Sequence, residues 1–401
     1  MAFVHILTKD LRPGMFIVQT GETWRSRPYL YAKPGLLKNE AEIAEIIKQG
    51  FVEAYYDPEK SEQSKEDVED LLSTPLAQKL PEPTVSLQDE IKAQVENYNN
   101  CVDHIQHVME EARSGRLDFL SAKPLMDNII SSLNRNADAL TSLAKIKTHD
   151  EYTFAHCVNV SIFSVAFGRY LGLREENLHN LGLAGLFHDI GKMRVPFNIL
   201  NAPRQLKPEE FAIMQKHAKF GEEMLSHIPN IPHNILAGVC DHHERFNGTG
   251  YPAKKKGSEI SPFGCIISVC DVYDALSSKR VYKEALPPSK ALSIMYGMRG
   301  ESWKTGLVEL FIKMLGIYPV GTPIGLTSGF KGVVTKSNPS APLYPTVLLY
   351  KDCKGQKIVP PSSVDLAQQH EMQIIKALST DTVDFDILTL ITEGKDVPKK
   401  S

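Results

Sequence analysis

Apolar residues at helical spacing over most of the chain constrain its fold more than any other feature. Leu87, Ile91 and Val95 start a pattern that recurs every three or four positions, which is typical of amphipathic helices. Breaks at Ser114-Gly115 and Lys123-Pro124 divide its first part. Residues 86–320 are therefore predicted to form one all-helical unit. Its later helices are expected at 158–171, 178–187, 208–225, 235–243, 263–277 and 289–298.

Both ends of the chain differ from this helical block. Strand-like segments at 4–7, 15–18 and 51–56 surround a helical pattern that ends at Gly50, so residues 1–60 are predicted to be a small α+β domain. Residues 61–85, rich in Ser, Glu, Lys and Pro, are predicted to be a linker. Short strands at 319–321, 328–334 and 346–350 predict a small β-rich extension and tail over 321–401. The predicted fold class is mainly α.

Composition and charge exclude several functions. The 45 Lys and Arg residues against 48 Asp and Glu residues give a net charge of −3, which argues against a general binder of nucleic-acid polymers. The six cysteines form no C-x-x-C pair and favour a reducing compartment. Charged residues come early at the N-terminus, and no apolar run approaches the ~18 residues that cross a membrane. We therefore expect a cytoplasmic protein without a membrane partner.

Seven imidazole and carboxylate residues in the helical block indicate a metal site. Mixed nitrogen and oxygen ligands favour iron, manganese, nickel or zinc over calcium or magnesium. One ion takes about four to six ligands, so seven protein groups predict two ions. Adjacent polar pairs inside apolar helices would be costly to bury without a partner, and a metal is such a partner. A lone histidine is more often structural, as we expect for His149, His179, His227 and His233. The seven candidates are His156, His188, Asp189, His217, His242, His243 and Asp271.

These residues resemble a known family. The pair His188-Asp189, with His156 before it and Asp271 after it, is similar to the HD superfamily of metal-dependent phosphohydrolases. Residues 242–252, HHERFNGTGYP, resemble the signature of its HD-GYP subgroup, the bacterial cyclic di-GMP phosphodiesterases of signal transduction. The resemblance covers roughly residues 85–318 and implies an HD-type helical bundle. The N-terminal module resembles the small accessory domain that often precedes HD-GYP in bacterial proteins.

The resemblance implies how the metals are held. One ion takes His156, His188, Asp189 and Asp271, and the second takes His217, His242 and His243, with Asp189 as the bridge. Some relatives bind a third ion through a Glu four residues before the first His. This chain has Tyr152 there, with Glu151 one position away. We therefore expect two divalent ions, Fe or Mn with Ni or Zn as alternatives, and linear pGpG as the product, with onward hydrolysis to GMP left open.

The expected reaction is attack on phosphorus by a metal-activated bridging hydroxide. Lys192, one turn after Asp189, is expected to neutralise charge in the transition state, although it could also be a solvated lysine at a helix end. Family counterparts of Arg280 and Lys283 bind the substrate phosphate; without the resemblance, both would be surface charges. Glu244 and Arg245 are expected to order the loop rather than bind metal.

The loop that carries the Gly-Tyr-Pro motif has two expected roles. It shapes the site beside the substrate, and in the family it is a proposed docking surface for diguanylate cyclase domains. Glycine provides the conformational freedom that such a loop requires, and proline ends it. Its residues are Gly248, Gly250, Tyr251 and Pro252.

Two other functions stay open. The absent third-site Glu is compatible with a catalytically weak sensor that binds cyclic di-GMP and signals through contacts. An HD phosphohydrolase for another cyclic nucleotide is the second alternative, which the Gly-Tyr-Pro loop argues against. A homodimer is also open.

Overall fold

A computed structural model describes residues 3–11, 15–18, 30–31, 33–37, 40–57, 81–146, 152–279, 285–338, 340–369, 371–380, 383 and 385–395. The chain divides into two compact units, Met1–Leu71 and Leu72–Ser401. Most of the predicted linker lies outside the described residues, and its boundaries stay a prediction.

The first unit is a small sheet with one helix. Its strands are β1 (Val4–Leu7), β2 (Phe16–Ile17), β3 (Leu30–Tyr31), β4 (Gly35–Leu36) and β5 (Glu53–Asp57), with α1 at Glu40–Lys48. The order is β1-β5-β2-β4, and β3 pairs in parallel with β5. Ile17, Ile43 and Ala54 are buried between sheet and helix. The α+β character predicted for this end is confirmed, although β3 and β4 were not predicted because each has only two residues.

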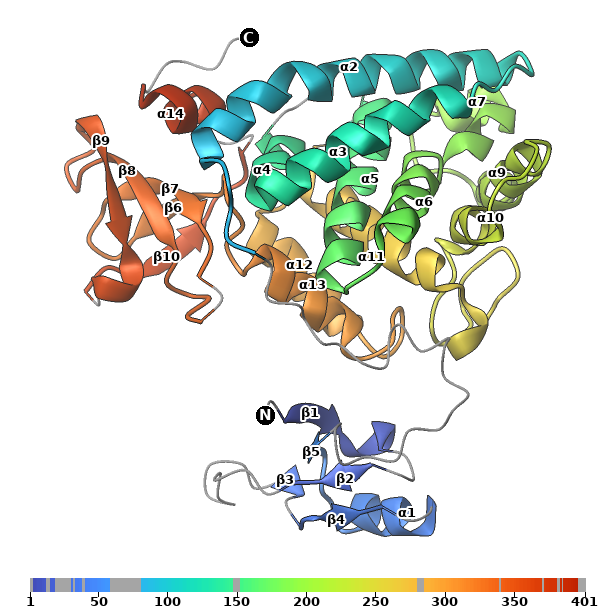
Figure 1. Cartoon of the computed structure of the whole chain (residues 1–401), viewed down its shortest axis with the longest axis horizontal. Helices are drawn as coiled ribbons and strands as arrows, with labels where there is room; N and C mark the ends of the chain where they lie inside the picture. The colour runs from blue at the N-terminus through green and yellow to red at the C-terminus, as the bar shows by residue number, and fades with distance from the viewer. Residues whose placement is uncertain are drawn as a thin grey trace. The chain divides into compact units, whose positions relative to one another are not determined.

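The second unit is mainly helical. A central helix, α5, packs against α4, α6 and α11, and its apolar residues are buried on all sides, as expected for a helix in the core. The long helix α2 lies along the outside of the bundle (Figure 1). The helices are α2 (Leu87–Arg113), α3 (Lys123–Arg135), α4 (Ala137–Ile146), α5 (Tyr152–Tyr170), α6 (Glu175–Leu186), α7 (Phe197–Leu200), α8 (Pro208–Met214), α9 (His217–Ser226), α10 (His233–Asp241), α11 (Pro262–Ser277), α12 (Pro288–Gly297) and α13 (Leu307–Leu315).

Two predictions about helix ends are wrong. The single helix expected over 208–225 is two helices, because α8 ends at Met214 and α9 begins at His217. The pairs at 188–189 and 242–243 were expected inside helices, but they follow the last residues of α6 and α10. At each of these three helix ends, the side chain of a histidine donates a hydrogen bond to one of the last carbonyl oxygens of the helix.

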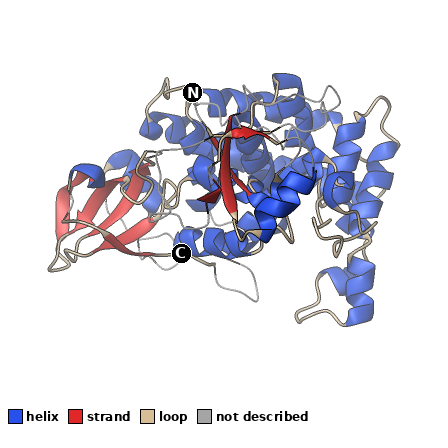
Figure 2. Cartoon of the chain, turned by 90° about the horizontal axis from the view of Figure 1, so that it is seen from below, coloured by secondary structure: helices blue, strands red, loops and turns tan. Residues whose placement is uncertain are grey.

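The C-terminal part is a five-stranded antiparallel sheet. Its strands run in the order β10-β6-β7-β8-β9 and lie together beyond the helices (Figure 2). Their bounds are β6 (Pro323–Leu326), β7 (Lys331–Lys336), β8 (Thr346–Lys351), β9 (Lys357–Asp365) and β10 (Ile374–Ala377). The strand predicted at 319–321 is a turn, in which Gly321 has a φ of +87°.

A last helix returns to the bundle. α14 (Ile387–Glu393) was not predicted, and it packs on α2, burying Ile387, Leu390 and Ile391 in the main core. The mainly helical fold with a small sheet at each end is confirmed. No helix among the described residues has the length and apolar character needed to span a membrane.

Candidate metal centre

Three of the candidate histidines also terminate helices. His188 and His242 follow α6 and α10, and His217 follows the end of α8. The last carbonyls of a helix have no partner within it. In each case the imidazole Nδ1 donates to the carbonyl oxygen three residues earlier, at 2.7–2.8 Å; these oxygens belong to Gly185, Met214 and Val239. This bond places the proton on Nδ1 and leaves an Nε2 lone pair for a ligand.

His156 is held by a carboxylate instead. Its Nδ1 donates to Asp274 Oδ2 at 2.8 Å, and its Nε2 lies 3.1 Å from Asp271 Oδ1. Burial disfavours the charged ring, but the hydrogen bonds to Asp271 and Asp274 raise the pKa of His156 to about 9. A proton on Nε2 therefore competes with a cation for this position, and cation binding there releases a proton.

Asp274 is fully buried and acts as a structural group. Lys145 Nζ and Asn159 Nδ2 both donate to Asp274 Oδ1 at 3.1 Å. Burial would raise the pKa of Asp274, but Lys145 and His156 lower it to about 2. The carboxylate is therefore ionised and orients the His156 ring.

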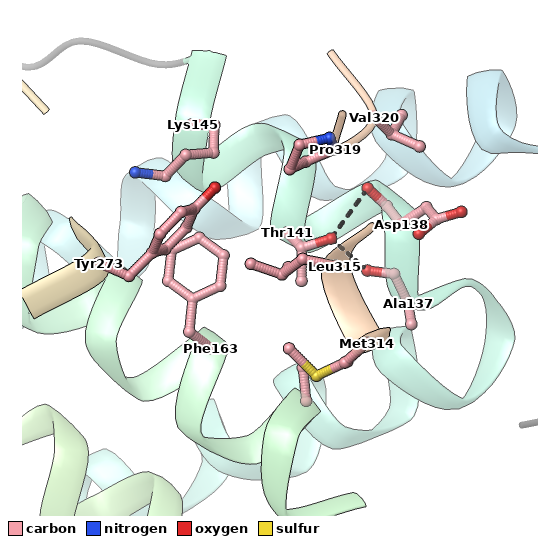
Figure 3. A pocket seen from close by; sticks show the side chains of 11 residues that line it. Ala137, Asp138, Thr141, Lys145, Phe163, Tyr273, Met314, Leu315, Pro319 and Val320 are labelled. Carbon is pink, nitrogen blue, oxygen red and sulfur yellow. Dashed lines mark hydrogen bonds between the residues drawn. The ribbon is translucent and has the colours of Figure 1, made fainter. Parts of the chain in front are cut away.

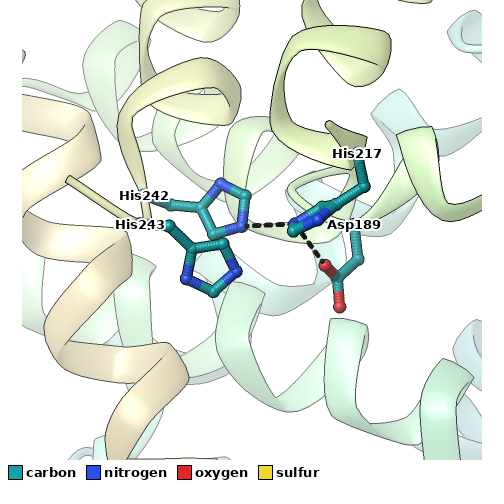
Figure 4. A group of neighbouring side chains, drawn as sticks. All are labelled: Asp189, His217, His242 and His243. Carbon is teal, nitrogen blue, oxygen red and sulfur yellow. Dashed lines mark hydrogen bonds and ion pairs between the residues drawn. The ribbon is translucent and has the colours of Figure 1, made fainter. Parts of the chain in front are cut away.

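The seven candidates form two adjoining clusters. The first cluster is His156, His188 and Asp271, and the second cluster is Asp189, His217, His242 and His243; within each, the possible ligand atoms lie within 4.8 Å of one another. Asp189 stands between them: its Oδ2 is 3.3 Å from His188 Nε2 in the first cluster, and its Oδ1 is 3.3 Å from His217 Nε2 in the second. Figure 4 shows the second cluster, with Asp189 facing His217. This arrangement suits a carboxylate shared by two cations.

The polar atoms of the clusters fit a bound cation. His188 Nε2 and Asp189 Oδ1 are buried and make no hydrogen bond, which is costly for polar atoms. The Nε2 atoms of His217 and His242 face each other at 3.3 Å, although both Nδ1 atoms already donate to carbonyls. A hydrogen bond between them would need a doubly protonated ring. Burial opposes this, because it lowers the pKa of His217 to about 4 and that of His242 well below its ordinary value.

The centre opens to solvent on one side. The side chains of His243 and Lys192 are 26% and 25% exposed and that of Asp271 is 11% exposed, whereas those of His188, Asp189 and His217 are at most 2% exposed. Lys192 Nζ lies 2.5 Å from Asp189 Oδ2. Burial would lower the pKa of Lys192, but Asp189 raises it, so the ammonium is charged at this opening.

The loop after His243 is anchored by two buried carboxylates. Glu244 accepts hydrogen bonds from the backbone N–H groups of Ala253 and Lys255, at 2.7 and 3.0 Å. Asp241, fully buried, pairs with Lys255 Nζ at 2.7 and 2.8 Å. The loop-ordering role expected for Glu244 agrees with these contacts. The sequence did not predict a role for Asp241 or Lys255. The only indication in the sequence was that Asp241 directly precedes His242.

The anchored loop places an aromatic ring over the second cluster. The Tyr251 ring lies 4.7 Å from that of His243, at 35° between the planes, and 6.2 Å from that of His217. Gly250 is required here, because a Cβ would lie 2.4 Å from Arg245 N and 2.5 Å from Glu244 Cα. The loop therefore closes tightly on its own start.

The described residues include only some of the predicted site residues. Arg280 and Lys283 lie outside the described residues, as do His149, Glu151 and the side chain of Tyr152. Among the described histidines, His179, His227 and His233 belong to neither cluster, in agreement with their expected structural or surface roles.

A small cavity lies behind the centre. It has a volume of about 50 Å³, and Lys145 and Tyr273 lie on one side of it, with Asp138 on the other (Figure 3). A cavity of this size holds one or a few water molecules and no nucleotide. The substrate site is therefore expected at the exposed side of the clusters.

Comparisons with known proteins agree with this geometry. Residues 124–304 match the HD domain family, residues 4–119 match a domain of unknown function (DUF3391), and residues 324–385 match a KOW domain associated with the HD domain. The chain is 32% identical to a cyclic di-GMP phosphodiesterase of Pseudomonas aeruginosa, over 91% of this chain and 89% of the relative.

Two further relatives match a smaller part of the chain. A cyclic di-GMP phosphodiesterase response regulator of Xanthomonas campestris is 33% identical over 48% of this chain and 52% of its own. A 3'3'-cGAMP-specific phosphodiesterase of Vibrio cholerae is 31% identical over 42% of this chain and 32% of its own. The HD domain implies that the centre binds divalent metal, and the clusters supply suitable ligands.

Proposed function

Because this chain belongs to the HD-GYP family of metal-dependent phosphodiesterases, we propose that it hydrolyses cyclic di-GMP at the two clusters. The observation that carries the proposal is Asp189, whose two carboxylate oxygens face one cluster each. The relative from Pseudomonas aeruginosa, named for this activity and matched over almost its whole length, supports the substrate.

In the proposed centre, each cluster holds one divalent cation, and Asp189 belongs to both. His156, His188 and Asp271 are the ligands of one, and His217, His242 and His243 are the ligands of the other. The mixture of imidazole and carboxylate supports Fe or Mn, with Ni or Zn as alternatives. Such cations lower the pKa of bound water and polarise phosphate oxygens.

The chain's own residues prepare this chemistry. Backbone carbonyls hold the proton of three imidazoles on Nδ1, so their Nε2 atoms face the centre unprotonated. Lys192 pairs with Asp189 and keeps a positive charge at the opening, where it would meet the phosphodiester. Arg280 and Lys283 are proposed to bind a phosphate of the substrate. We propose linear pGpG as the product, supported by Tyr152 at the position where relatives with a third ion carry Glu.

Other features support the proposed setting. Six cysteines without a disulfide fit a reducing compartment, and we propose the cytoplasm. In the loop, Gly250 is buried, but Gly248 and Tyr251 are partly exposed and Pro252 is exposed, which is compatible with docking of a diguanylate cyclase domain. A homodimer is part of the same proposal.

The names of three relatives support 3'3'-cGAMP as an alternative substrate. Three of the Vibrio cholerae relatives are named as specific for it, at 31–37% identity over 39–46% of this chain. The reaction at phosphorus would be the same, and only base recognition would differ.

Metal analysis of anaerobically purified protein and chromatography of its products test the proposal together. We expect about two metal ions per chain and conversion of cyclic di-GMP to pGpG faster than that of 3'3'-cGAMP. The double change His188→Ala and Asp189→Ala should abolish both metal content and turnover. Activity that survives it would refute the assigned centre, and retention of cyclic di-GMP without any product would favour the sensor.

A further inference from the structure

One short helix beside the centre exposes an aromatic ring. Phe211 lies on α8, a helix that contributes no buried residue to the core. Its side chain is 47% exposed, and it is not a member of the hydrophobic cores of the described residues. Two hydrogen bonds between Arg204 and Glu210, at 2.7 and 2.8 Å, brace the start of the helix. Packing in the hydrophobic core therefore does not explain why a phenylalanine occupies position 211.

The position of Phe211 relates it to the metal centre. Its ring lies 6.4 Å from that of Tyr251, at 82° between the planes, and Tyr251 covers His243. The last carbonyl of α8, that of Met214, accepts the Nδ1 proton of His217. The Tyr251 ring therefore lies between Phe211 and His243 of the second cluster, and α8 is hydrogen-bonded to His217, one of the proposed metal ligands.

We propose that Phe211 is the stacking surface for one purine base of the substrate. In a cyclic dinucleotide each base is joined through its ribose to the phosphates, so a base reaches the neighbouring surface while a phosphate lies at the cations. Flat aromatic side chains are the usual partners of unpaired bases. The perpendicular Tyr251 ring forms the adjoining wall. This inference rests on the proposed function and adds the element that holds the base.

Phe197 offers a matched comparison. It is also exposed, at 66%, but the guanidinium of Arg113 lies 5.6 Å from its ring centroid. Among the described residues its ring pairs with neither Tyr251 nor a histidine of the two clusters. Its truncation removes the same kind of side chain, with a larger exposed area, without affecting the proposed base site.

Steady-state kinetics on the metal-loaded, full-length enzyme test the inference. With cyclic di-GMP, Phe211→Ala should raise KM about tenfold and change kcat less than about twofold, with the wild-type metal content. Phe211→Trp, which keeps a flat ring, should retain a KM near that of the wild type. Phe197→Ala should match the wild type in both constants.

The outcomes separate the two proposals. A wild-type KM in Phe211→Ala overturns the base site while cyclic di-GMP hydrolysis stands. The same holds for a KM rise shared by Phe197→Ala, or for a loss of metal in Phe211→Ala, which would make Phe211 a support for His217. A wild-type enzyme that turns over no cyclic dinucleotide refutes the proposed function itself.

Discussion

Four of the five clustered histidines use Nδ1 to stabilise the fold and present Nε2 to the centre. Three donate to backbone carbonyls, whereas His156 donates to a carboxylate. A charged acceptor makes a stronger hydrogen bond and raises the basicity of the ring. The contacts of Asp274 are therefore expected to influence metal affinity although Asp274 belongs to neither cluster.

Asp274→Asn tests this influence. The change keeps the shape of the side chain and removes its charge, so we expect metal affinity to fall about 10–100-fold. Metal titration by calorimetry measures the effect. Glu90→Gln is the matched control, because Glu90 is also a buried carboxylate, but it pairs with Arg135 and Ser132 rather than with a clustered histidine. Equal metal affinity in both variants would contradict the proposed orienting role.

Helix termini, at the scale of secondary structure, bring the ligands together. The ends of α6, α8 and α10 each deliver a histidine, and the short 3-10 helix Ile190–Arg194 lies directly against the start of α9. Gly191 makes that approach possible, because a Cβ there would lie 1.9 Å from the carbonyl oxygen of His217. The contact involves backbone, so no side-chain rotation can relieve it.

Gly191→Ala should therefore displace α9 and with it His217. We expect a loss of about 1–3 kcal/mol in the free energy of unfolding, together with reduced metal content. Urea denaturation and metal analysis measure the two effects. Gly297→Ala, at the end of α12, serves as control, because nothing lies within 4 Å of its added Cβ. If Gly191→Ala keeps full metal content and stability, the close approach is not required.

In the second unit, at the scale of the whole molecule, three contacts join the sheet and the bundle. α14 returns from the sheet and packs on α2. Lys336 of β7 also acts electrostatically on Asp138 of α4. Thr380, just after β10, donates to the carbonyl of Lys145 at 3.4 Å. The C-terminal part is therefore integrated with the helical core.

Leu390→Ala probes the first contact. Leu390 is fully buried in the main core, so its truncation should cost about 2–5 kcal/mol of unfolding free energy. Chemical denaturation followed by circular dichroism measures the change. Val359→Ala, in the same C-terminal part but 84% exposed, should leave stability almost unchanged. Equal stability of the two variants would show that α14 does not support the bundle.

Asp138 provides a pH-dependent test of the second contact. Burial raises the pKa of Asp138 to about 6 from its ordinary value of 3.8, with Lys336 opposing the shift. The folded state thus keeps a proton that the unfolded state releases, so the contribution of Asp138 to stability falls as pH rises from about 4 to about 6. Thermal unfolding of wild type and Asp138→Asn measures this contribution as a difference: the stability of the wild type relative to Asp138→Asn should fall over this pH range. Parallel curves for the two proteins would contradict the raised pKa.

Local sequence patterns predicted most of the elements and all seven clustered residues. Helical periodicity persists over many turns, so the bundle was recognisable, whereas β3 and β4 are too short for a period to form. The grouping of the seven residues into two clusters came from the family resemblance, because spacing along the chain does not reveal which helices meet. The base site of Phe211 and the anchor Lys255 had no usable pattern, and the anchor Asp241 had only its position next to His242.

The sequence by itself determined which residues could build a metal centre and that helices would carry them, because both depend on residue type and short-range repetition. Only the tertiary structure decided where the helices stop and which residues meet. His156 and Asp274 are separated by 118 positions, yet their side chains are 2.8 Å apart. Such a contact depends on the packing of whole helices, whose mutual orientation is set by their combined buried surfaces rather than by any local segment.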